Sequence, residues 1–225
     1  MLLVVDIGNT NTVLGVFDEE KLMFRYRVAT NLKRTSDELV ATLFNMALIN
    51  GIDIKNIKDT IIASVVPDII YSWQSCNRKL FGKEAIIVDY TTDTGLNIAY
   101  DSPREVGADR IVDAVAVLKK YGGPAIVVDM GTAITFDVID EKGSYLGGSI
   151  APGIRIAQQG LFGSTAQLPK IDLRNPTTAI ATTTSESMVS GIVYGYIAMI
   201  DGIISQIQKE LKENHGTDEE VKVIA

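Results

Sequence analysis

LVVDIGNTNT, residues 3–12, joins a short apolar run to a polar turn through an aspartate. The same pattern returns as IVVDMGTAIT, residues 126–135. Matched letter by letter, the shared polar positions are Asp6 and Asp129, Gly8 and Gly131, and Thr12 and Thr135. An apolar run precedes and follows each turn, which predicts a strand, a tight turn and a second strand in both places. The repeat therefore predicts two related halves in one chain.

Apolar runs, turns and capping residues predict the elements around both copies. Residues 2–5 and 13–17 form a hairpin, residues 21–29 alternate like a third strand, and Thr35 precedes a helix that ends near Asn50. The other expected strands are residues 61–66, 85–88, 135–139, 145–150 and 221–225, and the other expected helices are residues 67–80, 154–161 and 185–211. Strands in hairpins, followed by strands that alternate with helices, predict an α/β fold with mixed sheets.

An Asp-x-Gly-x-Thr turn is suited to bind phosphate. Glycine allows the backbone to approach a phosphate closely, and threonine, asparagine and backbone N–H groups donate to its oxygens. The aspartate can bind a divalent cation, usually through water. One such turn is a weak signal, because it also occurs as an ordinary strand connection. Two copies in one chain predict a nucleotide held by both turns.

PREVGADRIVD, residues 103–113, leads into a further helix that stops at Gly122. Asp109 and Arg110 lie near the first turn of this helix. A carboxylate there complements the positive end of the helix dipole. The same position also suits a catalytic carboxylate, and the motif alone leaves both interpretations open.

Composition narrows the function classes. The net charge of -7 argues against a general nucleic-acid or anionic-membrane surface, so we expect small-molecule partners, no nucleic acid and no membrane. The N-terminus lacks a basic region and a cleavage site, and no uncharged apolar stretch reaches about 18 residues, so we expect a cytoplasmic protein. Cys76 and His215 are each the only residue of their kind, which argues against a zinc site and a Ser-His-Asp triad.

The helix expected at residues 185–211 is apolar on two stripes. One stripe runs from Met188 to Ile203 and the other from Val189 to Ile204. A helix with such a broad apolar arc is buried on both sides. A central core helix and a helix that faces a second subunit explain the pattern equally well, and we expect a homodimer.

Five motifs, taken in order, resemble the type III pantothenate kinases. They are DIGNTNTVLGVF (6–17), TGLNIAYDSPREVGADRI (94–111), DMGTAITFDVI (129–139), GGSIAPG (147–153) and MVSGIVYGY (188–196). The resemblance implies the actin-like ATPase superfamily: an α/β chain with duplicated actin-like (ribonuclease H-like) domains and an ATP cleft between them. It places the first domain at residues 1–100 and the second, with the substrate pocket and a long dimer helix, at residues 101–225.

The resemblance also implies an activity, namely ATP-dependent phosphorylation of pantothenate to 4'-phosphopantothenate, the first step of coenzyme A biosynthesis. Asp109 is implied as the general base. The substrate-binding residues implied are Tyr100, Gly107, Ala108, Asp109, Arg110 and Thr184. The ATP-binding residues implied are Asp6, Ile7, Gly8, Asn9, Thr10, Asn11, Thr12, Val13 and Thr132. Asp129 is implied to bind a monovalent cation, K⁺ or NH₄⁺, and Asp6 to bind Mg²⁺.

Two departures from the family pattern leave alternatives open. The approach to Thr184 reads Ala-Thr-Thr-Thr where the family commonly has Gly-Lys-Asn-Thr, and the chain ends before the family's Gly-Gly turn and final helix, so we expect its C-terminal end to be missing. A sugar kinase, a filament-forming relative and a non-catalytic, nucleotide-binding regulatory accessory protein are the other candidates. The presence of Asp6, Asp109 and Asp129 together favours the enzyme.

Overall fold

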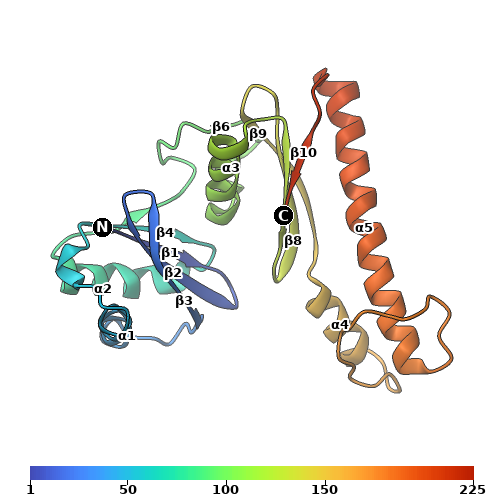
Figure 1. The fold of residues 1–225 in the computed structure, drawn as a ribbon, viewed down its shortest axis with the longest axis horizontal. Helices are drawn as coiled ribbons and strands as arrows, with labels where there is room; N and C mark the ends of the chain where they lie inside the picture. Colours follow the sequence, from blue (N-terminus) through green and yellow to red (C-terminus); the bar gives the residue numbers. More distant parts are fainter. The chain divides into compact units, whose positions relative to one another are not determined.

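A computed structural model describes residues 1–225 (Figure 1). The chain forms two compact units. The first contains residues 1–95 and 101–113, and the second contains residues 96–100 and 114–225. Each unit has one five-stranded sheet. The predicted α/β architecture, with two mixed sheets flanked by helices, is confirmed.

The first unit is built on β1 (Leu2–Ile7), which has neighbours on both sides. The order is β3-β2-β1-β4-β5, with β2 at Asn11–Asp18, β3 at Lys21–Ala29, β4 at Asp59–Ser64 and β5 at Ile86–Ile87. β1 pairs antiparallel with β2 and parallel with β4. The carboxyl ends of β1 and β4 therefore lie together at one edge, where ligands of open α/β sheets commonly bind.

Helices α1 (Ser36–Ile49) and α2 (Ile70–Phe81) complete the first unit, and the short η1 (Ile54–Asn56) and η2 (Pro67–Ile69) lie before β4 and α2. Thr35 and Glu38 form a capping box at the start of α1, which begins directly after Thr35 as expected. Gly82 ends α2 with a φ of 72°, a conformation that glycine adopts without cost. The buried side chains of Leu39, Ile62 and Trp73 belong to the core between sheet and helices.

The second unit repeats the first around β7 (Ala125–Met130). Its order is β10-β7-β8-β9-β6, with β6 at Asn97–Ile98, β8 at Ala133–Ile139, β9 at Ser144–Pro152 and β10 at Lys222–Ile224. Its helices are α4 (Ile154–Gly163) and α5 (Thr184–His215) (Figure 1). Earlier in the chain, η3 (Pro103–Glu105) leads into α3 (Ala108–Tyr121), whose last residue precedes Gly122, where the sequence predicts the helix to stop. β6 has no sequence signal and pairs with β9 over two residues only.

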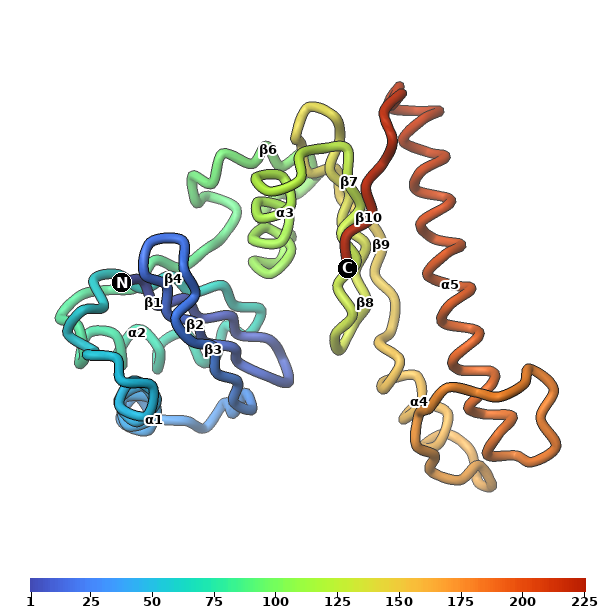
Figure 2. Tube along the Cα trace, viewed as in Figure 1, coloured from blue at the N-terminus to red at the C-terminus, as the bar shows by residue number.

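Helix α5 covers one face of the second sheet. Its inward residues pack against Ile126, Val128, Ile134 and Phe136. They are Tyr196, Met199, Ile200, Ile203, Ile204 and Ile207. The tube in Figure 2 shows the long connection, residues 164–183, that precedes this helix.

By length and composition, α5 is the one helix that could cross a membrane, although only 22% of its most apolar window is buried within the structure. Sequence reasoning did not select α5, because it required an uncharged apolar stretch, whereas the length and composition test allows up to two charged residues in the window. A helix with one face on a sheet satisfies the same length and composition test, so this finding is weak evidence for a membrane.

The register shows that the two repeated turns differ in length. Ile7 lies opposite Thr12 in the first copy, whereas Met130 lies opposite Ile134 in the second. The sequence alignment that matched Thr12 with Thr135 is therefore wrong. By strand register, the residue equivalent to Thr12 is Ile134. The second turn is shorter by one residue, and Thr10 corresponds to Thr132.

Candidate functional site

The first turn lies at the carboxyl end of β1. Asp6 is exposed there, and the Gly8 N–H donates to the Asn11 carbonyl at 3.0 Å, which closes the turn. Asn9, Thr10 and Asn11 are exposed at its tip. Ile7 and Thr12, in contrast, are buried. Val13 follows in β2 and is half-buried.

Thr30, directly after β3, holds this turn from the side. Its N–H donates to the Thr10 carbonyl at 3.0 Å, and its hydroxyl donates to the Gly8 carbonyl at 2.7 Å. The hydroxyls of Thr30 and Thr12 lie 2.9 Å apart. Sequence reasoning missed Thr30, because its partners lie 18 to 22 residues earlier in the chain.

The second turn uses the same backbone scheme. The Gly131 N–H donates to the Ala133 carbonyl, and the Gly153 N–H donates to the Thr132 carbonyl, both at 2.9 Å. Gly153 thus takes the place that Thr30 has in the first unit. Asp129 and Thr132 are exposed at the end of β7 and in the turn. The two turns therefore share one backbone construction, so the repeat seen in the sequence extends to the hydrogen bonds of the turns.

Asp109 lies at the first turn of α3, as the sequence predicts. Its Oδ1 accepts a hydrogen bond from the Arg110 N–H at 2.8 Å, and its side chain is half-buried. A Cβ atom on Gly107 would lie 2.5 Å from that Oδ1. The carboxylate thus occupies the space of the missing side chain, and any residue other than glycine would displace it. Ala108 and Arg110 are buried beside it.

Val65 connects Asp109 with the first turn inside the first unit. The Val65 N–H donates to the Ile7 carbonyl at 3.1 Å. The same residue contacts the Gly107 position, where an added Cβ would lie 3.6 Å from its Cγ1. The carboxyl ends of β1 and β4 therefore bring together the turn that follows Asp6 and the loop that carries Asp109. Sequence reasoning did not select Val65, which reads as an ordinary strand residue.

Tyr100 lies in the second unit against Tyr145 and Gly147. The two rings have centroids 6.3 Å apart, and a Cβ on Gly147 would lie 2.9 Å from Tyr100 Cε2. The Tyr145 hydroxyl donates to the buried Asp137 carboxylate at 2.8 Å, and Thr135 donates to the other oxygen of Asp137 at 2.9 Å. Tyr100 is half-buried and packs against Tyr145, whose own position is fixed by its hydrogen bond to Asp137.

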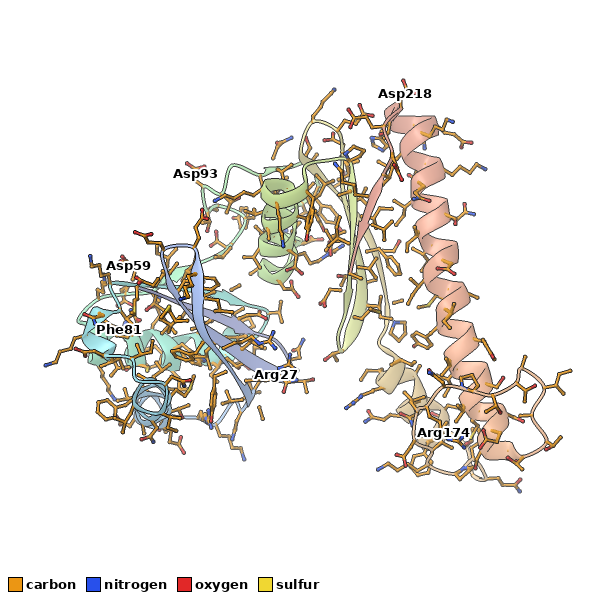
Figure 3. All side chains as sticks on the ribbon, viewed as in Figure 1. Arg27, Asp59, Phe81, Asp93, Arg174 and Asp218 are labelled. Atoms are coloured by element: carbon orange, nitrogen blue, oxygen red, sulfur yellow. The ribbon has the colours of Figure 1, made fainter.

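Thr184 is exposed at the start of α5, and a hollow of about 250 Å³ nearby is lined by residues 177, 178 and 180–182 and by Glu186. Thr183 caps the helix by accepting from the Glu186 N–H at 3.3 Å. A capping box of Thr183 with Glu186 is only half formed, because the Glu186 carboxylate pairs instead with Arg174, which is labelled in Figure 3.

The titratable side chains limit how the site could bind a metal ion and whether Cys76 could react. No three His, Cys, Asp or Glu side chains gather into a metal-binding cluster. A cation at either turn would therefore be held by at most two of these side chains, together with ligand oxygens and water. Burial raises the pKa of the Cys76 thiol to about 12, so this cysteine stays protonated and unreactive at neutral pH.

Comparisons with known proteins point to one family. A family model described as type III pantothenate kinase matches residues 2–206. A type III pantothenate kinase from Finegoldia magna is 47% identical over 225 residues, which are 100% of this chain and 85% of the relative.

Solved structures resemble the chain at lower identity. A structure described as a Baf family transcriptional activator from Campylobacter jejuni has 20% identity and a TM-score of 0.53, and covers 89% of this chain and 78% of that chain. The ethanolamine utilization protein EutJ from Carboxydothermus hydrogenoformans has 15% identity and a TM-score of 0.48, and covers 99% of this chain and 84% of that chain. At 20% identity, the Campylobacter structure supports the fold alone.

Proposed function

The chain belongs to the type III pantothenate kinase family, and we propose that its two turns and Asp109 divide the phosphorylation of pantothenate between them. The kinase transfers the γ-phosphate of ATP to the primary hydroxyl of pantothenate, the entry reaction of coenzyme A biosynthesis. One observation supports our assignment most strongly. The Val65 N–H donates to the Ile7 carbonyl, and the Val65 side chain lies 3.6 Å from where a Cβ on Gly107 would be, so the first turn and the Asp109 loop lie close together.

The first turn binds the phosphates of ATP in this proposal. Its exposed residues Asn9 to Asn11 present side-chain and backbone donors, and an added Cβ on Gly8 would lie only 3.2 Å from the Asn11 carbonyl. Asp6 stands exposed at the strand end, where a carboxylate can bind Mg²⁺ through water. Thr132 serves the same purpose in the second turn. Phosphoryl transfer depends mostly on positioning and charge neutralisation, which such rigid turns provide.

Asp109 orients the substrate hydroxyl and accepts its proton late in the reaction. Its Oδ1 already accepts from the Arg110 N–H, so we assign Oδ2 as the proton acceptor. An aspartate is a weak base in water, and its contribution comes from holding the hydroxyl aligned on the γ-phosphorus. Tyr100, Gly107, Ala108, Arg110 and Thr184 complete the pantothenate pocket in this assignment; the buried Ala108 would contribute backbone atoms.

A coupled assay with ATP, Mg²⁺, K⁺ and pantothenate tests this function. We expect ADP release that depends on pantothenate, with none above background when glucose replaces it or when no acceptor is present. ADP release that depends on glucose would identify a sugar kinase instead. ATP binding without turnover on either acceptor would favour a non-catalytic regulatory protein.

Asp129 binds a monovalent cation beside the phosphates in this proposal. It is exposed at the end of β7, and hard cations prefer oxygen ligands of this kind. We expect wild-type turnover to be higher in K⁺ or NH₄⁺ than in Na⁺, and Asp129→Ala to have low turnover that is equal in all three salts. Asp172→Ala, at another exposed aspartate of the same unit, serves as the control. Equal wild-type rates in all three salts would contradict the role.

We also propose a cytoplasmic homodimer in which α5 packs against a second copy of itself. Ile197 and Tyr194, two large apolar residues of α5, leave 52% and 42% of their surface exposed. Ile197→Glu should therefore convert a dimer into a monomer by light scattering at micromolar concentration. Ile49→Glu, at a residue of α1 that is 76% exposed, should leave the mass unchanged. A wild-type monomer at micromolar concentration would contradict the proposal.

A further inference from the structure

Thr30 belongs to none of the sequence motifs, yet it makes two hydrogen bonds to carbonyls of the first turn and a third with the hydroxyl of Thr12, at the start of β2. We propose that Thr30 is a positioning residue for ATP: it fixes the peptide planes of the turn so that their N–H groups face the nucleotide phosphates. The inference rests on the proposed role of this turn in ATP binding.

The geometry of the peptide bond explains how Thr30 would act. In a trans peptide the carbonyl and the N–H of the next residue point in opposite directions. The only cis peptide bond of the chain is Gly123–Pro124, so the planes of the turn are trans. Because Thr30 holds the carbonyls of Gly8 and Thr10, the N–H groups of Asn9 and Asn11 point away from Thr30. Two donors of the turn are thereby oriented together.

The hydroxyl of Thr30 has a defined donor and acceptor role. A carbonyl can only accept, so the single hydroxyl hydrogen of Thr30 goes to Gly8. Thr12 must then donate to the Thr30 oxygen, at 2.9 Å. Thr12 is only 2% exposed, so water has little access to compete for this bond. The buried Thr12 therefore fixes Thr30, and Thr30 fixes the turn.

The second turn provides an internal comparison. Gly153 donates its N–H to Thr132 as Thr30 does to Thr10, but glycine has no hydroxyl. The second turn is also shorter, since Met130 pairs with Ile134 where Ile7 pairs with Thr12. The additional hydrogen bond thus occurs in the unit whose turn has the additional residue. This correlation supports a specific role of the Thr30 hydroxyl in the longer turn.

Thr30→Val tests the proposal in the full chain, because valine keeps the shape and removes the hydroxyl. We expect the Kd and the KM for ATP to rise by about tenfold, the scale of losing a buried hydrogen-bond pair, while the KM for pantothenate stays within about twofold. Thr30→Ser, which keeps the hydroxyl, should restore ATP binding. If the valine variant does not fold, Thr30→Ala removes the same hydroxyl with a smaller side chain.

Thr60→Val is the matched control. Thr60 lies in the same unit, is 4% exposed and has a buried hydroxyl without a hydrogen-bond partner. Its valine variant should bind ATP as the wild type does and should not lose thermal stability, because an unpaired polar group is removed. Wild-type ATP affinity in Thr30→Val, or equal losses for ATP and pantothenate, would overturn the proposal. The Kd for ATP is measured without pantothenate. A wild-type protein that binds ATP but does not phosphorylate pantothenate would therefore contradict the proposed function without contradicting the role of Thr30.

Discussion

Asp109→Asn lowers kcat for pantothenate phosphorylation by about 10³-fold, because general-base catalysis by a positioned side chain contributes on that order. The substitution separates the two interpretations of this aspartate. The asparagine Oδ1 can still accept from the Arg110 N–H, as the Asp109 Oδ1 does at 2.8 Å. The second carboxylate oxygen, however, becomes an amide that cannot accept a proton. The helix therefore keeps its hydrogen bond while the reaction loses its base.

A carboxylate at another helix start provides the control for this experiment. Asp37 lies in the first turn of α1 and pairs with Lys79 at 2.6 Å. Asp37→Asn removes a comparable helix-dipole interaction, worth about 0.3–1 kcal/mol, and should leave kcat unchanged. Measured together, steady-state rates and melting curves distinguish the roles. An Asp109→Asn enzyme with wild-type kcat and only a slightly lower Tm would show that Asp109 is a helix-capping residue and nothing more.

Much of the fold could be predicted because the informative signals are local. The repeated strand and turn, the capping box at Thr35 and the stop at Gly122 depend on residues a few positions apart. Patterns of that range survive in any tertiary context. The half-formed box at Thr183 shows the limit of such signals. There Glu186 stands at the position that a capping box requires, but its carboxylate forms an ion pair with Arg174 instead of bonding to the backbone of Thr183.

The candidate site was predictable in its ligand-facing residues and not in the residues that support them. Asp6, Asp109 and Asp129 stand in recognisable motifs. Thr30 and Val65 do not, because they act through backbone atoms that are distant in sequence. A hydroxyl that donates to a carbonyl 22 residues away leaves no local pattern. The register difference between the turns was hidden for the same reason, since only strand pairing reveals which residue is missing.

Gly153→Ala should produce the second large effect, because one methyl group would collide with the backbone of the second turn. A Cβ at this position would lie 2.3 Å from the Thr132 carbonyl oxygen and 2.4 Å from that of Gly131. The φ and ψ of Gly153 are -64° and 150°, which alanine adopts freely, so the effect is one of contact and not of backbone strain. The turn must shift, and its bond from the Gly153 N–H to Thr132 is lost.

We expect Gly153→Ala to reduce the free energy of unfolding by about 2 kcal/mol, as overpacking does, and to raise the KM for ATP by about tenfold or more, since a misplaced group costs substantial rate and binding. Gly160→Ala is the matched control: Gly160 lies inside α4 with no atom within 4 Å of an added Cβ. That variant should gain up to about 1 kcal/mol from helix propensity and keep its ATP affinity. Equal ATP affinity in both variants would mean that the second turn does not hold the nucleotide, and the duplicated turn would then be a feature of the fold alone.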